Sequence, residues 1–213
     1  MRLHDYPASA NCYKVRLLLA QLGLEYERVN VDIFGGDTLT DEFARLNPAR
    51  MTPVLDTDDG PLPESGAILV HLAEGTELLP DDPAVRAQVM RWLFYEQAEI
   101  QPGIAGLRFR LLTGRLHPDD PSVAARQATG AEPLQVLDDH LREHAFLAGE
   151  RYSIADISLY AYVHVAGDAR FDLDAYPAVR TWVERVEATP GHMNDLQPMP
   201  PNSQLGVSRS IYG

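Results

Sequence analysis

The hydrophobic positions near the start of the chain follow first a helix spacing and then a strand spacing. Residues 3–6 read as a short strand, and four residues that follow fall at i, i+3, i+4 and i+7: Val15, Leu18, Leu19 and Leu22. This spacing is typical of the buried face of a helix, and Gly23 predicts its end. Val29, Val31 and Ile33 then alternate with polar residues at the period of a strand. A helix that joins two neighbouring strands of one sheet requires them to be parallel, so we expect a parallel pair.

A shorter helix, two short strands and a further helix complete this first region. Phe43 and Leu46 predict a short helix that ends at Asn47-Pro48. A strand over residues 53–56 and a second one are joined by a turn at Asp58-Asp59-Gly60. A helix over residues 65–74 closes the region, which gives the order β-α-β-α-β-β-α.

After a proline-punctuated linker at residues 78–83 the strand pattern disappears. Ser153 and Asp156 have the spacing of a capping box, in which each side chain bonds the other residue's backbone at a helix start. We expect helices at 84–115 (bent near Pro102-Gly103), at 121–144, after Ser153, and from 177 to 190. The pattern predicts an α/β domain at 1–77, an all-helical domain at 84–192 and a loosely ordered tail at 193–213.

The composition of the chain limits which classes of function and which cellular locations we expect. The net charge is −13, and Lys14 is the only lysine among 18 basic residues, which argues against binding nucleic acid. No apolar run predicts a signal peptide or a membrane span. The single cysteine, Cys12, excludes an internal disulfide and favours a reducing compartment, so we expect a cytoplasmic protein. No histidine spacing is typical of a metal site, and no metal is proposed.

The first candidate chemistry lies where the first strand meets the first helix. Ser9 and Asn11 supply a hydroxyl and an amide donor at the N-terminus of a helix, where unpaired N–H groups favour an anion such as a thiolate. Serine and asparagine are also preferred helix caps, so the spacing alone favours the structural interpretation.

A second group of residues lies later in the same region. Pro53 enters a strand, and a cis bond there would expose the backbone of Thr52 to a ligand. Ser65 as a helix cap could bind a carboxylate, and Glu64 could pair with an α-amino group. Each feature alone has an ordinary structural explanation as well.

Together these motifs resemble the glutathione transferase family over almost the whole chain. The resemblance is carried by Ser-x-Asn-x-x-Lys-Val-Arg from Ser9, by Asn47-Pro48, by Thr52-Pro53-Val54-Leu55, by Glu64-Ser65-x-Ala67-Ile68 and by the capping box. It implies a thioredoxin-like first domain with a cis proline at Pro53, a helical-bundle second domain, glutathione as co-substrate, and a homodimer whose second substrate, a small electrophile or a disulfide, lies between the domains.

The resemblance also implies roles for individual residues. Ser9 matches the thiol-activating serine, and Asn11 matches an asparagine found in members similar to disulfide reductases. Thr52 would pair with the cysteinyl backbone of glutathione, and Glu64 and Ser65 would bind its γ-glutamyl end. Where many relatives have a lysine this chain has Met51, so Arg50 is a candidate to bind the glycyl carboxylate in its place.

The sequence leaves three alternative functions open. The first is a transferase that conjugates the glutathione thiolate to a small hydrophobic electrophile. The second is a glutathione-dependent disulfide-bond reductase, which Asn11 keeps open. The third is a non-enzymatic scaffold of the same fold that binds glutathione or a protein. Cys12 is expected to be a small buried residue, because Ser9 stands where a Cys-x-x-Cys motif would have its first cysteine.

Overall fold

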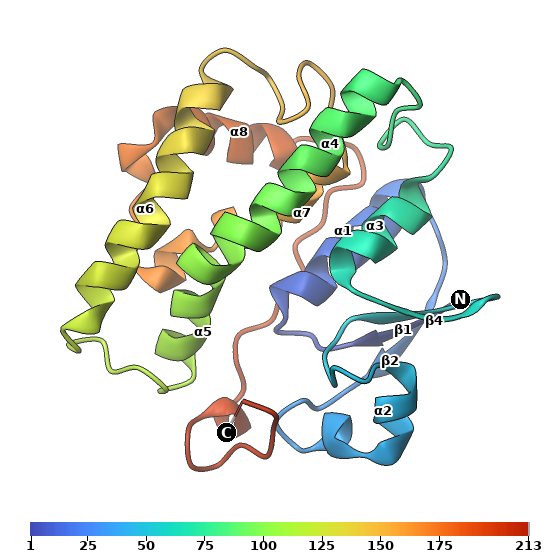
Figure 1. Ribbon diagram of the computed structural model, residues 1–213, viewed down its shortest axis with the longest axis vertical. Coiled ribbons are helices and arrows are strands. Elements are labelled where there is room, and N and C mark those ends of the chain that lie inside the picture. Colours follow the sequence, from blue (N-terminus) through green and yellow to red (C-terminus); the bar gives the residue numbers. More distant parts are fainter. Residues whose placement is uncertain (213) are drawn as a thin grey trace. The chain divides into compact units, whose positions relative to one another are not determined.

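The computed structural model describes residues 1–212 and divides into two compact units (Figure 1). The first contains residues 1–72 together with the chain from residue 193 onward, and the second contains residues 73–192. The chain therefore leaves the first unit once and returns to it at its C-terminal end.

The first unit has the predicted order of strands and helices. Its elements are β1 (Arg2–Asp5), α1 (Ala10–Leu22), β2 (Glu27–Asn30), the 3-10 turn η1 (Asp37–Leu39), α2 (Asp41–Leu46), β3 (Val54–Thr57), β4 (Gly60–Pro63), α3 (Ser65–Ala73) and a 3-10 turn η5 (Pro201–Ser203) in the C-terminal segment. The sheet order is β2-β1-β3-β4. Leu3 pairs with Arg28 in a parallel ladder and with Leu55 in an antiparallel one, which confirms the predicted parallel pair.

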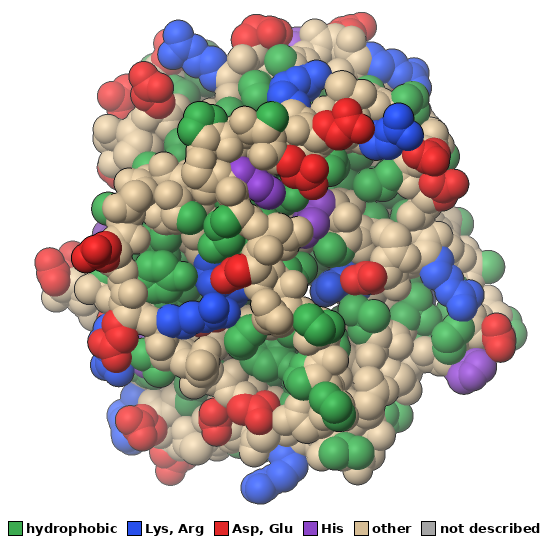
Figure 2. Space-filling model, turned by 180° about the vertical axis from the view of Figure 1, so that it is seen from behind, with side chains coloured by type: hydrophobic (Ala, Val, Ile, Leu, Met, Phe, Trp, Pro, Cys, Tyr) green, Lys and Arg blue, Asp and Glu red, His purple; other side chains and the backbone are tan. Residues whose placement is uncertain are grey.

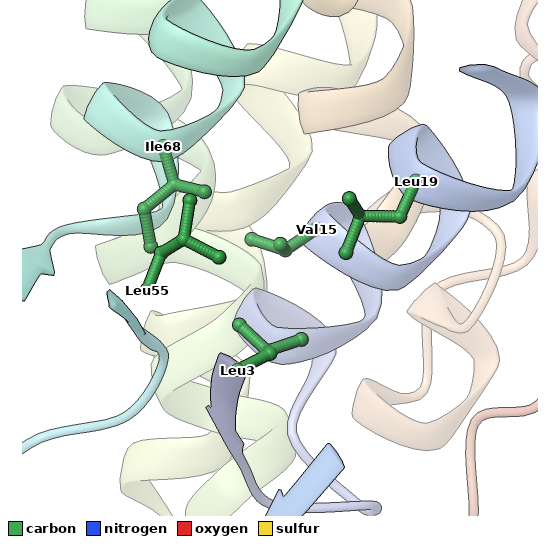
Figure 3. Packing of buried hydrophobic residues seen from close by; sticks show 5 residues of the cluster. All are labelled: Leu3, Val15, Leu19, Leu55 and Ile68. Atoms are coloured by element: carbon green, nitrogen blue, oxygen red, sulfur yellow. The ribbon is translucent and has the colours of Figure 1, made fainter. Parts of the chain in front are cut away.

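The core of this unit lies between the sheet and the helices. Figure 3 shows its centre, to which β1, α1, β3 and α3 contribute fully or almost fully buried side chains: Leu3, Val15, Leu19, Leu55 and Ile68. Two of them come from the helix stripe that the spacing predicted. Gly23 has a left-handed φ of 64°, and its N–H bonds the carbonyls of Leu19 and Ala20, so it ends α1 as expected. The buried face of α1 thereby determines how its N-terminus lies above the sheet.

The second unit is helical, as the sequence predicted. Its elements are α4 (Pro83–Tyr95), the π-helical segment η2 (Glu96–Ala105), α5 (Gly106–Leu112), α6 (Ser122–Leu141), α7 (Ile154–Val163), the 3-10 turns η3 (Ala166–Ala169) and η4 (Leu173–Ala175), and α8 (Pro177–Glu187). The expected bend near Pro102 is a stretch of wider π-helical turns, because proline has no N–H to continue the ordinary ladder.

A close approach of two backbones organises this unit. A Cβ atom built on Gly130 of α6 would lie 2.7 Å from the carbonyl oxygen of Gly103 in η2 and 2.4 Å from the ring of Phe171. Neither distance is possible for a real side chain, so only glycine allows α6 to pack this closely on η2.

The capping box at the start of α7 is present as predicted. The Ser153 side chain accepts from a backbone N–H, and the fully buried Asp156 carboxylate accepts from the Ser153 N–H at 2.9 Å. The same carboxylate accepts from the indole of Trp182 in α8 and from the N–H of Leu147, both at 2.9 Å. One local motif thereby connects three segments of the helical unit.

The sequence predicts a loosely ordered tail over 193–213, and this stays a prediction. Residues 193–212 make specific hydrogen bonds and ion pairs with the first unit, while Gly213 lies outside the described residues. Asp195 bonds the fully buried Arg16 and lies near the exposed Arg28, and a composition rich in Pro, Asn and Ser does not reveal these contacts. The predicted domain limits at 77 and 84 stay predictions.

Charged side chains of both signs lie on the surface of the protein (Figure 2). On the face shown in Figure 2, acidic side chains are spread among basic ones. Within residues 1–212, no helix combines the length and the apolar character that crossing a bilayer requires.

Candidate functional site

Ser9 begins helix α1, where the sequence placed the first candidate chemistry. Its backbone is extended (φ −84°, ψ 121°), and its hydroxyl oxygen accepts from the N–H of Cys12 at 3.3 Å, so it caps the helix. The capping role and the candidate chemical role therefore belong to the same side chain. Capping fixes the Ser9 hydroxyl at the positive end of the α1 dipole.

Asn11 lies in the first turn of α1 and is oriented by two donors. Its Oδ1 atom accepts from Lys14 Nζ at 2.8 Å and from the Ser65 hydroxyl at 3.4 Å. Two donors on the carbonyl oxygen orient the amide group. Lys14, the only lysine of the chain, is fully buried.

Ser65 comes to Asn11 from a segment 54 residues away. It is the first residue of α3 and is almost fully buried, so the N-termini of α1 and α3 lie near one another. The sequence predicted that Ser65 would cap this helix, but the helix begins at Ser65, one residue earlier than that role requires. Glu64 precedes it with a left-handed φ of 73°, which is uncommon for a residue other than glycine, and its side chain is exposed.

The peptide bond between Thr52 and Pro53 is cis, as the sequence predicted. The N–H of Tyr6 donates to Cys12 Sγ at 3.3 Å, and the side chains of Thr52 and Ser9 are close enough to lower the pKa of the Cys12 thiol. Cys12 therefore connects the start of α1 to the segment before β3. Sequence reasoning missed this role, because no local pattern pairs Cys12 with a residue 40 positions away.

Cys12 itself is fully buried, as expected from the sequence. Burial, together with the nearby Asp5 carboxylate, raises the pKa of its thiol to about 11, although the hydrogen bonds from Thr52, Tyr6 and Ser9 act in the opposite direction. At neutral pH the group is a thiol and not the thiolate that reacts as a nucleophile.

Arg50 and Met51 lie directly before Thr52 in the same region, and both make contacts within their own segment. One Arg50 nitrogen, Nη1, donates to the carbonyls of Thr38 and Thr40 at 2.8 and 2.9 Å, so the guanidinium ties down the segment around η1. The Met51 carbonyl accepts from the Asn47 side chain at 2.9 Å, and the Met51 side chain is exposed. The structure brings Ser9, Asn11, Thr52 and Ser65 together and leaves Arg50 directed at its own loop.

Two sequence profiles cover most of the chain. Residues 3–78 match the N-terminal domain of glutathione S-transferase, and residues 91–190 match its C-terminal domain. The chain belongs to the glutathione S-transferase family. The predictions of the family, of an enzyme and of the fold class are thereby confirmed, and the enzyme assignment argues against the non-catalytic scaffold.

Individual relatives agree with this family assignment. The disulfide-bond oxidoreductase YfcG of Escherichia coli (strain K12) is 32% identical over 96% of this chain and 97% of its own length. A glutathione S-transferase structure from Pseudomonas fluorescens [Pf-5] is 43% identical, with a TM-score of 0.88 over 92% of this chain and 98% of that one. A glutathione transferase from Pseudomonas putida, solved with one glutathione disulfide per subunit, is 30% identical with a TM-score of 0.81 over 92% and 90% of the two chains.

Proposed function

We propose that this glutathione transferase binds glutathione in its first unit and conjugates the glutathione thiolate to a small hydrophobic electrophile. The observation that carries the proposal is the meeting of Ser9, Asn11 and Ser65 at two helix N-termini. Helix N-termini stabilise anions through their unpaired N–H groups and their dipoles, and glutathione contributes two carboxylates as well as the thiolate. This local arrangement offsets the overall charge of −13, which disfavours an anionic ligand.

The proposed chemistry is ionisation of the glutathione thiol followed by nucleophilic attack. The Ser9 hydroxyl and the Asn11 amide group donate to the sulfur, and the dipole of α1 adds to their effect, so the thiol loses its proton to solvent near neutral pH. Lowering the pKa of a thiol by about two units corresponds to roughly 2.7 kcal/mol. The thiolate then forms a sulfur–carbon bond with the electrophile while the leaving group departs with the electron pair of its broken bond.

The remaining site residues position the peptide. We propose that the Thr52 backbone beside Pro53 pairs with the cysteinyl part of glutathione, as an added strand pairs with a sheet edge. Glu64 would pair with the α-amino group, and Ser65 at the start of α3 would bind the γ-glutamyl carboxylate. Arg50 and Met51 are the candidates beside the glycyl end. Because Arg50 already bonds two carbonyls, we expect its contribution to glutathione affinity to be small.

Disulfide-bond reduction is the second candidate function. Asn11 and the relationship to a disulfide-bond oxidoreductase favour it. In that reaction the thiolate attacks a disulfide sulfur and expels one thiolate, and a second glutathione thiolate resolves the mixed disulfide to glutathione disulfide. The resolving thiol must come from glutathione, because Cys12 is buried with a pKa of about 11.

One set of experiments separates these proposals. Calorimetric titrations with reduced and with oxidised glutathione measure binding, and turnover with an aryl halide and with a small disulfide identifies the reaction. We expect saturable binding of reduced glutathione and turnover of the aryl halide; faster turnover of the disulfide would assign the reductase function.

The mechanism is tested by replacing the two donors. We expect the double variant Ser9→Ala, Asn11→Ala to lose about 100-fold in turnover near neutral pH, the equivalent of two pKa units in the bound thiol. Ser122→Ala with Asn30→Ala, which removes the same groups elsewhere, serves as the matched control. Unchanged activity of the Ser9 and Asn11 double variant would falsify the mechanism.

We also propose a homodimer and a cytoplasmic location. The family resemblance supports a homodimer, and the single reduced cysteine supports a cytoplasmic location. Light scattering during gel filtration measures the assembly: twice the mass of one chain is the expected result, and a monomer would exclude the dimer.

A further inference from the structure

The C-terminal segment makes direct contact with two loops of the first unit, one of which carries Ser9. Its Gln197 N–H donates to the carbonyl of Pro7, two residues before Ser9, at 3.1 Å. Farther along, the Asn202 side chain donates to the Asp32 carboxylate at 2.9 and 3.2 Å, and the Arg209 N–H donates to the Phe34 carbonyl at 2.7 Å. One loop joins β1 to α1 and carries Ser9, and the other follows β2.

A network of alternating charges holds this segment in place. Arg16, which is fully buried in α1, donates to the buried Asp5 at 2.6 Å and, through Nε, to both oxygens of Asp195 at 2.8 and 3.0 Å. Arg28 donates to Asp5 at 2.5 Å and approaches Asp195 at 3.5 Å. Burial by itself would lower the pKa of Arg16, but Asp5 and Asp195 more than offset this and raise it. The charge on Arg16 is therefore permanent.

Arg16 also connects the segment to the Ser9 loop. Its third nitrogen, Nη2, donates to the Pro7 carbonyl at 3.2 Å, the same oxygen that accepts from Gln197. The Ser9 N–H in turn donates to the Tyr6 carbonyl at 3.0 Å, so residues 6–9 form one short, hydrogen-bonded turn. Asp195 orients the guanidinium that holds this turn, although it is far from Ser9 in sequence.

We propose that Asp195 is a positioning residue for Ser9, and that the C-terminal segment thereby tunes the ionisation of the bound glutathione thiol. The inference rests on the proposed role of Ser9. A hydroxyl donor stabilises a thiolate only when its distance and direction are held, so freedom in the Pro7–Ser9 turn weakens the donor without removing it. The inference predicts a change in thiol ionisation, and only a small change in glutathione affinity.

The test measures the ionisation of glutathione bound to the full-length protein. Thiolate absorbance is titrated against pH for the wild type, for Asp195→Asn and for Asp195→Glu, with Asp59→Asn as the matched control, because the exposed Asp59 loses the same charge far from the segment. We expect Asp195→Asn to raise the pKa of the bound thiol by about 1, and to lower kcat near pH 7 about 10-fold. The dissociation constant of glutathione should change less than about 3-fold, and Asp195→Glu should restore part of the loss.

A second variant covers the case in which Asp195→Asn fails to fold. Gln197→Pro removes the N–H that bonds Pro7 but leaves every charge in place, so it should raise the thiol pKa in the same direction. A thiol pKa equal to that of the wild type in the folded variants overturns the inference. If instead the wild type does not bind glutathione, or binds it without lowering the thiol pKa, the proposed function fails, and this outcome is distinguishable from the first.

Discussion

Replacing Asp156 with alanine should destabilise the helical unit far more than removing an ordinary helix cap. The carboxylate is fully buried and accepts four hydrogen bonds, from the N–H groups of Leu147 and Ser153, the Ser153 hydroxyl and the Trp182 indole, at 2.9 to 3.1 Å. In Asp156→Ala these donors stay buried and lose their acceptor. At about 1 kcal/mol for each, with the hydroxyl free to rotate toward another acceptor, the free energy of unfolding should fall by about 3 to 4 kcal/mol.

The matched control is Asp82→Ala at the start of α4. Asp82 also caps a helix, and it accepts from the N–H groups of Ala84 and Val85, both at 3.0 Å, but it is exposed, so water replaces the lost acceptor. This variant should lose about 1 kcal/mol. Urea unfolding followed by circular dichroism and by tryptophan fluorescence gives the midpoint and slope for each variant. Equal losses in the two variants would refute the reasoning that burial and the number of donors determine the effect.

Three further outcomes are expected. Burial raises the pKa of Asp156 to about 6 from 3.8, so the folded protein binds this proton more tightly than the unfolded chain does. That contribution to the free energy of unfolding is complete below about pH 4 and is lost as the pH rises through about 6. The stability of the wild type relative to Asp156→Asn, measured by urea unfolding, should therefore fall by about 3 kcal/mol over this range. A relative stability that rises with pH would contradict the prediction. Gly130→Ala should lower the free energy of unfolding by about 1 to 3 kcal/mol, because the added methyl group overlaps Gly103 and Phe171. The control Gly167→Ala, whose methyl group meets no atom within 4 Å, should change the free energy of unfolding little. Similar thermal midpoints for the two variants would argue against the close packing of α6 on η2. Cys12, with a pKa of about 11, should react with an aromatic disulfide reagent at pH 8 about 100-fold more slowly in the folded protein than in urea, and equal rates would show that the thiol is accessible and ionised.

Much of the fold follows from patterns that are local in the sequence. The stripe from Val15 to Leu22 predicted the buried face of α1, and Gly23 predicted where the helix ends. The parallel pairing of β1 with β2 followed from the helix between them. Helix α8 lies within the predicted range 177–190, and its buried face consists of Val179, Trp182 and Val186.

Parts of the candidate site needed the three-dimensional structure. Ser9 and Asn11 were candidates from the sequence, but the donors that orient Asn11 come from the buried Lys14 and from Ser65. Arg50 is a candidate partner for a carboxylate by its charge, and only the structure shows that its guanidinium also donates to the carbonyls of Thr38 and Thr40. A sequence shows that a charge exists, whereas the packing of the chain determines which atoms that charge reaches.

The sequence by itself determined the family, the order of elements and the motifs whose partners lie within one helical turn. The capping box of Ser153 and Asp156 belongs to this class, because backbone geometry alone brings residues three positions apart within hydrogen-bond distance. Only the tertiary structure decided that Asp195 would pair with Arg16, 179 residues away. Such a contact depends on how the core holds α1 and on where the chain returns to the first unit, and no local spacing encodes either.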